Sequence, residues 1–556
     1  MAEEKTGLPW LNSYDENVPP NLTYPEKTLP RLLKETVEKY PDRPALIFFG
    51  RRITYRQLGR AVDNLAAALA GMGVEKGTKV ALLLPNCPQY VIAYYAVLQR
   101  GATVVPVNPL NTERELEYIF GDAGVKVAFV FNLLAERLEK VRQRINAPRQ
   151  VVYTSVADFL PFPLNFVYPF RQKMGPAVRE AVKKGASFKG LLGRTRAKAP
   201  PAEVDVFKDL AVLIYTSGTT GVPKGVMLSH YALVVNAYHC ISWVDMGQSP
   251  ESESILGVLP IFHGFGMSVC MNAALLSGSS SILVPRYNPE ELLKAIHRYR
   301  PTLFAGVPTM YIGLINHPDL KRYDLSSLRG CFAGAASLPP EVKRRFEELT
   351  GSRLMEGYGL TEAVTAKCAN PYRGVNKTGS IGIPFPDTVM RIVDMETGKK
   401  ELAPGEVGEI VLKSPDLMLG YYKQPEEAAS AIRDGWLYTG DIGSMDEDGY
   451  FYIVERKKDL IITGGFNVYP REVEDVLYAH PAVKEACVVG VPDDYRGEAV
   501  KAFVVLREGA ACTEEEIVSF CRERLVPYKV PRSVEFREEL PKSAIGKILR
   551  RELRGR

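Results

Sequence analysis

Apolar runs of β type alternate with helical stretches through most of the chain, and this alternation constrains the fold more than any other feature. A strand at 79–86, a helix at 87–101 and a strand at 102–109 follow one another, and the same rhythm returns across 279–308. Strands that alternate with helices are typical of proteins with largely parallel sheets. We therefore predict an α/β fold.

The texture of the sequence changes toward the C-terminus. Residues 388–414 hold short strands separated by turn residues, which favours a small antiparallel unit. A length of 556 residues exceeds one compact core. We predict a large N-terminal domain, 1–455, built from two αβ-layered subdomains plus a small β-barrel-like subdomain at about 385–455. A hinge at 456–460 then leads to a small, mobile α+β C-terminal domain at 461–556.

Composition narrows the function classes. The net charge of +5 is small for this length and gives no reason to expect a nucleic-acid partner. The first ten residues lack the basic and apolar regions of a signal peptide, and no run of 18 apolar residues appears. The eight cysteines are scattered without CxxC spacing, as in reduced core positions. We expect a cytoplasmic protein; its oligomeric state stays open, a homodimer included.

Residues 215–230 read YTSGTTGVPKGVMLSH and have the composition of a phosphate-binding loop. The glycines let backbone N–H groups approach phosphate oxygens, the hydroxyls add donors, and Lys224 adds charge. The Walker pattern fails, because Pro223 stands where it needs glycine and Gly225 stands where it needs a hydroxyl. We expect this loop to join a strand at 211–215 to a helix that Ser229 caps. An unrelated P-loop NTPase is thereby disfavoured.

This loop resembles the phosphate loop of the adenylate-forming superfamily, which contains acyl-CoA synthetases, nonribosomal adenylation domains and luciferases. Further motifs of that family occur in the family's order, so the resemblance covers nearly the whole chain. They are LPIFHGFGM (259–267), GAASLPP (334–340), GYGLTE (357–362), YTGD (438–441), ERKKDLIITGG (455–465) and PKSAIGKILR (541–550). Seven motifs in order are far more specific than any one of them.

The resemblance implies a two-step ligase that uses ATP, Mg²⁺ and CoA. A carboxylate attacks the α-phosphate of ATP and gives acyl-AMP and pyrophosphate, after which the CoA thiolate displaces AMP. Phosphate charge must be neutralised and the attack positioned. The resemblance assigns the β- and γ-phosphates to Thr216, Ser217, Gly218, Thr219, Thr220, Gly221 and Lys224.

The resemblance also assigns the nucleotide contacts. Tyr358 is expected to stack on adenine, Thr361 to meet the α-phosphate, and Glu362 to hold Mg²⁺ together with Thr216. Asp441 and Arg456 are expected to bind the ribose. Backbone close to the purine is expected at Gly334, Ala335, Ala336, Gly357 and Gly359.

Lys547 is the residue that the resemblance places at the centre of adenylation. Its ammonium would bridge the carboxylate and the α-phosphate, which requires the small domain to fold over the large one. Lys458 matches the hinge position of the family. After adenylation the small domain would swing about Lys458 and bring backbone near the CoA thiol. That CoA channel is expected at Gly464, Gly465 and Phe466.

The substrate end is expected to be uncharged and apolar. His263 is expected near the substrate carboxylate among the catalytic side chains (Lys547, Lys224, Thr361, Glu362 and His263), though not as a base, since a fatty acid is already ionised. No acid follows Phe262 to pair with an amino group. The stretch FGMSVCMNAALL at 265–276 suits an alkyl chain. Overall the chain looks like a bacterial long-chain fatty acid–CoA ligase.

One segment stands apart. Residues 157–174 are rich in aromatics and prolines, and 171–198 carry nine Lys/Arg with one acid, Glu180. This segment is either an insertion packed on the domain surface or a contact with the inner face of the cell membrane.

Several alternatives stay open. They are an aryl or medium-chain acid–CoA ligase, a fatty-acyl-AMP ligase that loads a carrier protein, and a lipid-binding or uptake protein with a degenerate ligase body. The intact Lys224, Glu362, Asp441, Arg456 and Lys547 argue against the last of these.

Overall fold

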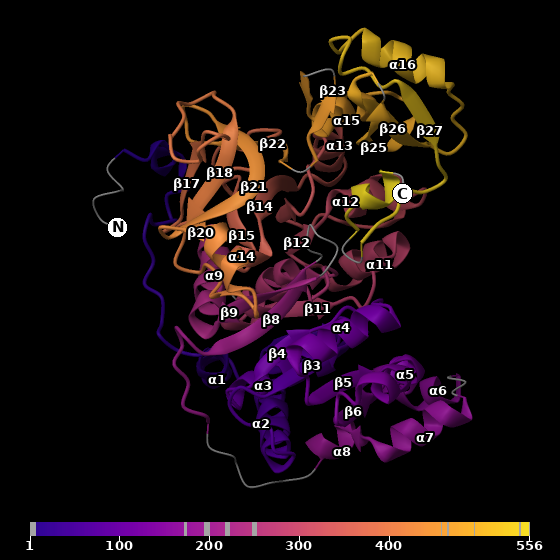
Figure 1. The fold of residues 1–556 in the computed structure, drawn as a ribbon. Coiled ribbons are helices and arrows are strands. Elements are labelled where there is room, and N and C mark those ends of the chain that lie inside the picture. The colour runs from indigo at the N-terminus through magenta and orange to yellow at the C-terminus, as the bar shows by residue number, and fades with distance from the viewer. Residues whose placement is uncertain are drawn as a thin grey trace.

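The computed structural model describes residues 7–171, 175–193, 201–216, 223–246, 253–457, 459–463, 466–493, 495–543 and 546–554. Two mixed sheets form the body of the large N-terminal part (Figure 1). The first sheet runs in the order β16 (Ile383–Pro384), β15 (Ala366–Ala369), β14 (Arg353–Gly359), β13 (Gly330–Ala333), β12 (Leu303–Gly306), β10 (Ser254–Gly257), β11 (Ser280–Leu283), β1 (Pro44–Phe48), β2 (Arg51–Thr54).

The second sheet contains the strands that the alternating sequence pattern predicts. Its central strands are parallel, as expected for strands joined by helical crossovers. Its order is β19 (Gly420–Tyr421), β9 (Lys224–Ser229), β8 (Leu210–Thr216), β4 (Thr103–Pro106), β3 (Lys79–Leu83), β5 (Val127–Phe131), β6 (Gln150–Thr154), β7 (Ala186–Ser187).

Helices pack against both sheets, and the main core lies between the two sheets. α2 (Tyr55–Gly71) contacts β1 of the first sheet, whereas α3 (Pro88–Gln99) contacts β3 and β4 of the second. α3 is buried along nearly its whole length, since it lies in the interior rather than on the surface. The outer helices are α1 (Leu29–Lys39), α4 (Glu113–Ala123), α5 (Ala135–Ile145), α11 (Pro289–Tyr299), α12 (Pro308–Ile315) and α13 (Pro340–Thr350).

A separate antiparallel sheet forms the predicted small β subdomain. It consists of β17 (Val389–Val393), β18 (Gly408–Lys413), β20 (Ile432–Arg433), β21 (Trp436–Met445) and β22 (Phe451–Arg456). α14 (Pro425–Ala431) lies beside it. The change of texture in the sequence near residue 385 therefore marks a real change of architecture.

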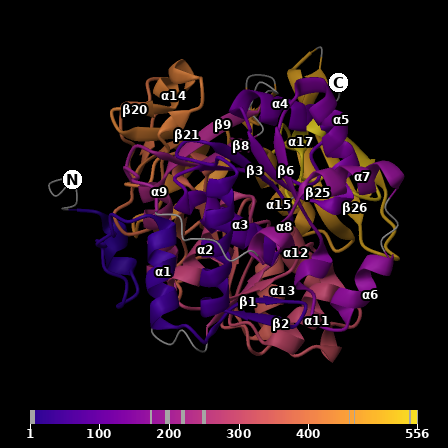
Figure 2. The same cartoon turned by 90° about the horizontal axis from the view of Figure 1, so that it is seen from below.

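The C-terminal lobe, residues 461–554, has its own core. Its sheet holds β23 (Ile461–Thr463), β24 (Phe466–Val468), β25 (Val483–Asp493), β26 (Gly497–Leu506) and β27 (Ser533–Phe536). Its helices are α15 (Pro470–Tyr478), α16 (Glu514–Arg522) and α17 (Arg550–Leu553). Figures 1 and 2 both place this lobe (yellow) apart from the β subdomain (orange) on the large domain. The expected mixed α/β fold with a large and a small part is confirmed, while the exact boundaries at 455 and 461 stay predictions.

Candidate active site

Two neighbouring strands of the β subdomain hold an acidic and a basic side chain side by side. Asp441 on β21 lies directly opposite Arg456 on β22. The Nε of Arg456 lies 2.9 Å from Oδ1 of Asp441, and the hydroxyl of Tyr358 donates to Oδ2 at 2.6 Å. The carboxylate of Asp441 raises the pKa of Arg456. Three residues from separate motifs thus form one cluster, in which Asp441 is only 2% exposed and Arg456 is 40% exposed.

An apolar cavity opens beside this cluster. This cavity is partly open to solvent. The expected adenine-loop residues Gly334, Ala335, Gly357, Tyr358 and Gly359 form one side; Ala336 is not among the lining residues. The other side is apolar and includes Cys240, Trp243, Ile255, Val269, Phe304, Phe332 and Phe385.

The expected alkyl-binding stretch 265–276 contributes less to the cavity than its sequence indicated. It forms a π-helix at Gly266–Ala273 that continues into α10 (Ala274–Leu276). Phe265 and Val269 line the cavity, whereas Met267 and Met271 are fully buried in the core. π-helical turns are frequent at functional sites, and here the wider turn lies at the cavity wall. Trp243 at the end of α9 (His230–Trp243) is a lining residue that sequence reasoning missed.

His263 lies in the cavity wall. Its Nδ1 accepts a hydrogen bond from the backbone N–H of Phe265 at 3.3 Å. Burial lowers the pKa of His263 to about 4, and the ammonium of Lys547 adds to that effect. The imidazole is therefore neutral at pH 7. No Asp, Glu, Lys or Arg belongs to the described cavity lining, so the cavity suits an uncharged ligand tail.

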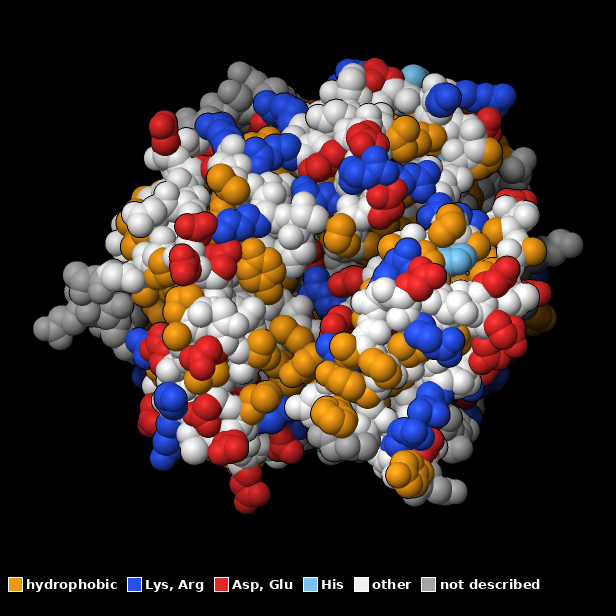
Figure 3. All heavy atoms as spheres, turned by 90° about the horizontal axis from the view of Figure 1, so that it is seen from above, with side chains coloured by type: hydrophobic (Ala, Val, Ile, Leu, Met, Phe, Trp, Pro, Cys, Tyr) orange, Lys and Arg blue, Asp and Glu red, His pale blue; other side chains and the backbone are white. Residues whose placement is uncertain are grey.

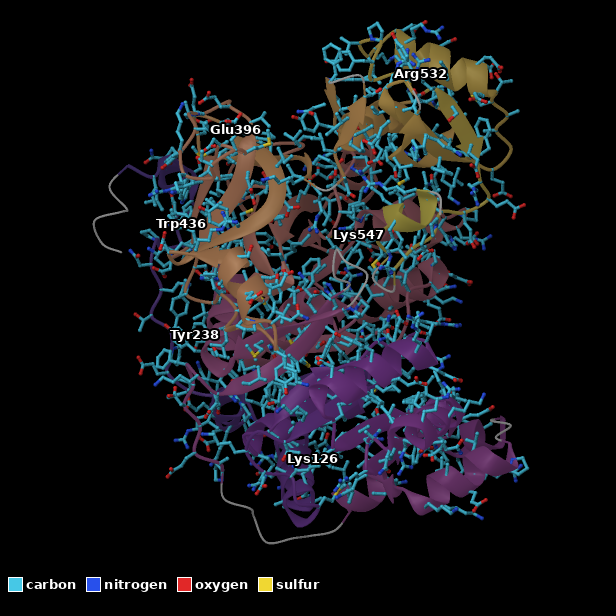
Figure 4. The ribbon with its side chains drawn as sticks, in the orientation of Figure 1. Lys126, Tyr238, Glu396, Trp436, Arg532 and Lys547 are labelled. Carbon is cyan, nitrogen blue, oxygen red and sulfur yellow. The ribbon has the colours of Figure 1, made fainter. Side chains whose placement is uncertain are left out.

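Lys547 reaches this site from the C-terminal lobe, and Figure 4 shows it between that lobe and the large domain. Burial and the guanidinium of Arg456 lower the pKa of Lys547 to about 8, and the carboxylate of Asp441 opposes this shift. The preceding loop is docked, because the Oγ1 of Thr309 donates to the carbonyl of Gly546 at 3.2 Å. The structure thus joins the last motif of the chain to the Asp441 cluster.

A second group of side chains surrounds Glu362. Tyr421 donates from its hydroxyl to Oε1 of Glu362 at 2.9 Å, and the backbone N–H of Met418 donates to the Glu362 carbonyl at 2.8 Å. Lys224 lies over the ring of the same Tyr421, 5.3 Å from its centroid, and donates to Oε2 of Glu427 at 2.5 Å. Sequence reasoning missed Tyr421 and Glu427, although both lie in the polar run GYYKQPEE at 420–427.

The donor set fits Mg²⁺ bound together with a nucleotide. Among the described residues no group of three or more His, Cys, Asp or Glu side chains could hold a metal ion. Mg²⁺ commonly takes one or two carboxylates and completes its shell with phosphates and water. Glu362 supplies such a carboxylate at the end of β14. Thr216, the other expected ligand, ends β8 opposite Lys224.

The expected connection after the phosphate loop is wrong in one respect. Lys224 does not lie in a loop that leads into a helix; it begins β9, which pairs antiparallel with β8. The short apolar run from Val226 to Leu228 favours a strand there. α9 begins only after β9, and Ser229 caps it as predicted by accepting from the N–H of Ala232 at 3.1 Å. β8 and β9 therefore form an antiparallel hairpin, with Thr216 opposite Lys224.

Some expected site residues lie outside the described residues. They are Ser217, Gly218, Thr219, Thr220 and Gly221 of the phosphate loop, Lys458 of the hinge, and Gly464 and Gly465 of the CoA channel. Phe466 is described: it begins β24, is 55% exposed, and stacks on the ring of Tyr528 with centroids 4.6 Å apart. Thr361 lies in the short turn that carries Glu362.

A buried charge cluster lies behind the cavity wall. Lys367 on β15 pairs with Asp416, and both side chains are fully buried. Asn236 on α9 donates to Oδ2 of Asp416 at 2.9 Å, and Ser414 donates to Oδ1 at 2.5 Å. Cys368, next to Lys367, lines the cavity. The cluster thus ties α9 and β15, which form the wall, to the segment that leads to Tyr421.

The segment at 157–198 forms short helices at the edge of the large domain. They are α6 (Leu164–Arg171), α7 (Pro176–Lys184) and α8 (Phe188–Leu192). Phe162 is 85% exposed and Phe166 is 70% exposed, with Leu164 beside them. Figures 1 and 2 both place α6 at the periphery. In the described parts of the chain, no helix has the length and apolar character needed to cross a bilayer.

The chain belongs to the family of AMP-binding enzymes. The family model described as AMP-binding enzyme matches residues 33–422, and the model described as AMP-binding enzyme C-terminal domain matches 472–547. Asp441 and Arg456 lie between these two matches, Tyr358 lies within the first, and Lys547 is at the end of the second.

Within that family, the chain is similar to proteins named long-chain-fatty-acid–CoA ligase. It is 48% identical to one from Bacillus subtilis over 98% of this chain and 97% of that protein. It is 40% identical to one from Salmonella typhimurium over the same shares. Its fold resembles an anthranilate CoA ligase solved with anthranoyl-AMP, with a TM-score of 0.86 and 29% identity over 96% of this chain and 97% of that one.

Proposed function

We propose that this protein is an ATP-dependent, AMP-forming ligase that activates a fatty acid as acyl-AMP and transfers the acyl group to CoA. One observation carries the proposal: Lys547 is close enough to Arg456 and Asp441 for their charges to act on its pKa, and its own charge acts on His263 in the wall of a cavity whose described lining carries no charged side chain. The expected adenine-loop residues line the same cavity as the apolar side chains, which supports a nucleotide site next to an apolar acid site. The names of the most similar relatives favour a long acyl chain.

The first step forms a bond between a carboxylate oxygen and the α-phosphorus and breaks the bond to pyrophosphate. Negative charge builds on the α-phosphate as this happens, and the ammonium of Lys547 is positioned to offset it. Lys224 offsets the charge of the leaving pyrophosphate. Asp441 and Arg456 orient the ribose, and neutral His263 gives the carboxylate a wall without a competing charge.

The Mg²⁺ that the family uses would be held by Glu362, with Thr216 near the phosphates, and would neutralise phosphate charge. Tyr421 orients the Glu362 carboxylate through its hydroxyl. In the second step a C–S bond to CoA forms, the C–O bond to AMP breaks, and the thiol proton is lost to solvent. Phe466 and the glycines before it are the proposed passage for the CoA arm.

Two half-reactions test this function. The protein is incubated with ATP, Mg²⁺ and fatty acids of six to twenty carbons, and ATP–pyrophosphate exchange is followed before thioester formation with CoA. Aryl acids are tested in the same way, and absence of exchange with every acid would contradict the ligase assignment. Exchange without a thioester would indicate a carrier protein as the acceptor. Preference for aryl or medium-chain acids would replace the long-chain substrate.

We also propose that the segment at 157–198 touches a membrane surface from the cytoplasmic side. The support is the exposure of Phe162 and Phe166 next to a segment rich in Lys and Arg. Apolar anchors beside basic charge suit anionic lipid. The acid substrate is itself lipid-soluble, so a surface contact would bring the enzyme to it.

Co-sedimentation with phosphatidylcholine vesicles, with and without phosphatidylglycerol, tests the membrane contact. The double variant Phe162→Ser/Phe166→Ser should sediment less than the parent protein with the anionic vesicles. Leu110→Ser is the matched control, because Leu110 is 73% exposed and lies outside this segment. Equal sedimentation of all three proteins would count against the proposal.

A further inference from the structure

One carboxylate at the end of the large domain holds two elements of the C-terminal lobe. Glu455 lies on β22 and is 6% exposed. Its Oε2 accepts from the Nη1 of Arg550 at 2.9 Å and from the backbone N–H of Arg471 at 3.2 Å. Arg471 is in the first turn of α15, where backbone N–H groups lack partners within the helix. Glu455 therefore caps a helix of the other lobe and binds its arginine at the same time.

Arg550 is held from both sides. Its Nη2 donates to Oε2 of Glu474 on α15 at 2.7 Å, while Nη1 donates to Glu455. The guanidinium is planar and its donors are fixed in direction, so two carboxylates set its orientation. Glu474 belongs to the same lobe as Arg550, whereas Glu455 belongs to the large domain. Of the two carboxylate contacts of Arg550, the contact with Glu455 is therefore the one that joins the C-terminal lobe to the large domain.

Arg550 lies three residues after Lys547, and the segment between them is tightly closed. The backbone N–H of Leu549 donates to the Pro541 carbonyl at 2.8 Å. The backbone N–H of Lys547 donates to Oγ of Ser543 at 3.1 Å. A displacement of Arg550 would therefore move Lys547 with it.

A second arginine, Arg471, also makes contacts between the C-terminal lobe and the large domain. Arg471 donates from Nη1 to the carbonyl of Ile453 on β22 at 2.5 Å, and its Nη2 lies 3.9 Å from Oε1 of Glu356 on β14. Glu356 directly precedes the expected adenine loop. Ile453 and Glu455, two of the large-domain residues in these contacts, lie immediately before the proposed hinge at 456–460, so a rotation there would change these contacts.

We infer that Glu455 and Arg550 are positioning residues that hold Lys547 at the α-phosphate for adenylation and separate when the lobe turns for thioester formation. This rests on the proposed function. The pair touches neither substrate in this role; it acts through the placement of Lys547. Its removal should slow the first half-reaction and spare the second.

The test compares the two half-reactions of the full-length protein. Glu455→Gln keeps the shape of the side chain but removes the charge that Arg550 meets. We expect ATP–pyrophosphate exchange to fall about tenfold to a hundredfold, because small displacements of a reacting group have effects of that order. Thioester formation from supplied acyl-AMP and CoA should stay within about twofold of the parent protein, since it does not use the Lys547 placement.

A double-variant cycle and a matched control sharpen the test. Arg550→Gln should give the same split, and Glu455→Gln/Arg550→Gln should be no slower than either single variant if the two act as a pair. Lys501→Gln is the control, because Lys501 pairs with Glu535 at 2.8 Å within the same lobe. It should leave both half-reactions unchanged.

Three outcomes would overturn the inference. Exchange that is unchanged in Glu455→Gln would do so, and so would an equal fall of both half-reactions accompanied by a lower melting temperature, which indicates a general loss of structure. A parent protein that performs neither half-reaction would instead remove the proposed function, and this inference with it. The parent measurement therefore separates the two kinds of failure.

Discussion

The surroundings of Lys547 lower the pKa of its ammonium group. Burial and Arg456 lower its pKa to about 8, so the ammonium is charged at pH 7 and loses its charge as the pH rises past about 8. We predict that kcat/KM for ATP–pyrophosphate exchange falls through that range, because kcat/KM reports the free enzyme. The measurement is exchange at fixed ionic strength from pH 6.5 to 9.5. A profile that stays flat to pH 9.5 would contradict the prediction.

Replacing Lys547 tests the same residue by charge rather than by pH. Lys547→Ala should reduce exchange by about 10²- to 10³-fold, the usual effect of removing one preorganised charge or donor at a transition state. Thioester formation from supplied acyl-AMP should persist. The two rates are measured on the same preparation. Loss of both would show that Lys547 serves the fold or the second step.

Tyr421 offers a finer prediction. Tyr421→Phe removes the hydroxyl that donates to Glu362 and keeps the ring beneath Lys224. The Mg²⁺ concentration for half-maximal exchange should rise about threefold to tenfold, since such a hydrogen bond contributes roughly 1 kcal/mol. Tyr422→Phe is the neighbouring control. An unchanged Mg²⁺ dependence would separate Tyr421 from the metal.

Among single residues, the sequence predicted the site side chains that belong to short motifs. It missed the side chains that contact those motifs from distant parts of the chain. Asp441, Arg456 and Tyr358 were predicted as nucleotide contacts, and the structure brings them together. Tyr421 reaches Glu362 across 59 positions of the chain. Glu455 lies inside a recognised motif, yet its partner Arg550 could be paired with it only once the orientation of the lobe was known.

Elements bring the two ends of the site together. β21 and β22 present Asp441 and Arg456 on one face. β14 carries Tyr358, the short turn after it carries Glu362, and the β8–β9 hairpin carries Lys224. The sequence predicted the strands and helices of the parallel region well, because apolar periodicity reports burial directly. It missed β9, since glycine and proline before it resemble the approach to a helix. It could not predict the π-helix, because 265–276 is mostly apolar and its two polar residues, Ser268 and Asn272, do not define a helical period.

The buried Lys367–Asp416 pair gives a prediction for these elements. Lys367→Met leaves the Asp416 carboxylate buried without its cation, so the free energy of unfolding should fall by about 3–5 kcal/mol. Lys367→Met/Asp416→Leu removes both charges and should be less destabilising than the single variant. The measurement is denaturant unfolding.

An exposed pair provides the control for that experiment. Lys294 and Glu290 lie one helical turn apart on α11, and both side chains are more than half exposed. Lys294→Met should leave the unfolding midpoint nearly unchanged, because exposed ion pairs contribute little. If Lys367→Met behaved like Lys294→Met, the buried pair would not hold the cavity wall.

The whole molecule presents two lobes to the same side. Figure 3 views that side and shows hydrophobic side chains interspersed with charged ones of both signs over the β subdomain and the C-terminal lobe. The sequence predicted that the lobes exist, but not their relative orientation. The contacts of Glu455 and Arg471 with the other part of the molecule help to fix that orientation. The structure has the arrangement in which Lys547 faces the nucleotide residues.

Gly546 tests this docked arrangement. Its φ is +79°, and a Cβ there would lie 2.9 Å from Oγ1 of Thr309 on α12 of the large domain. Gly546→Ala should therefore push the lobe away and slow exchange more than thioester formation. Gly509→Ala is the matched control, because its φ is +76° and a Cβ there meets nothing within 4 Å. Equal effects of the two variants would show that only backbone strain matters.

The order of strands in the first sheet has a consequence for the synthesis of the protein on the ribosome. β1 lies near the start of the chain, yet one of its edges is completed by β11, with Leu46 opposite Ser281. A ribosome that adds about 5–20 residues per second needs roughly 10–50 s to supply that partner. During this interval β1 lies outside the exit tunnel with the backbone N–H and C=O groups of one edge unpaired. The cell must shield it, so expression of this protein should depend on chaperones that act on nascent chains.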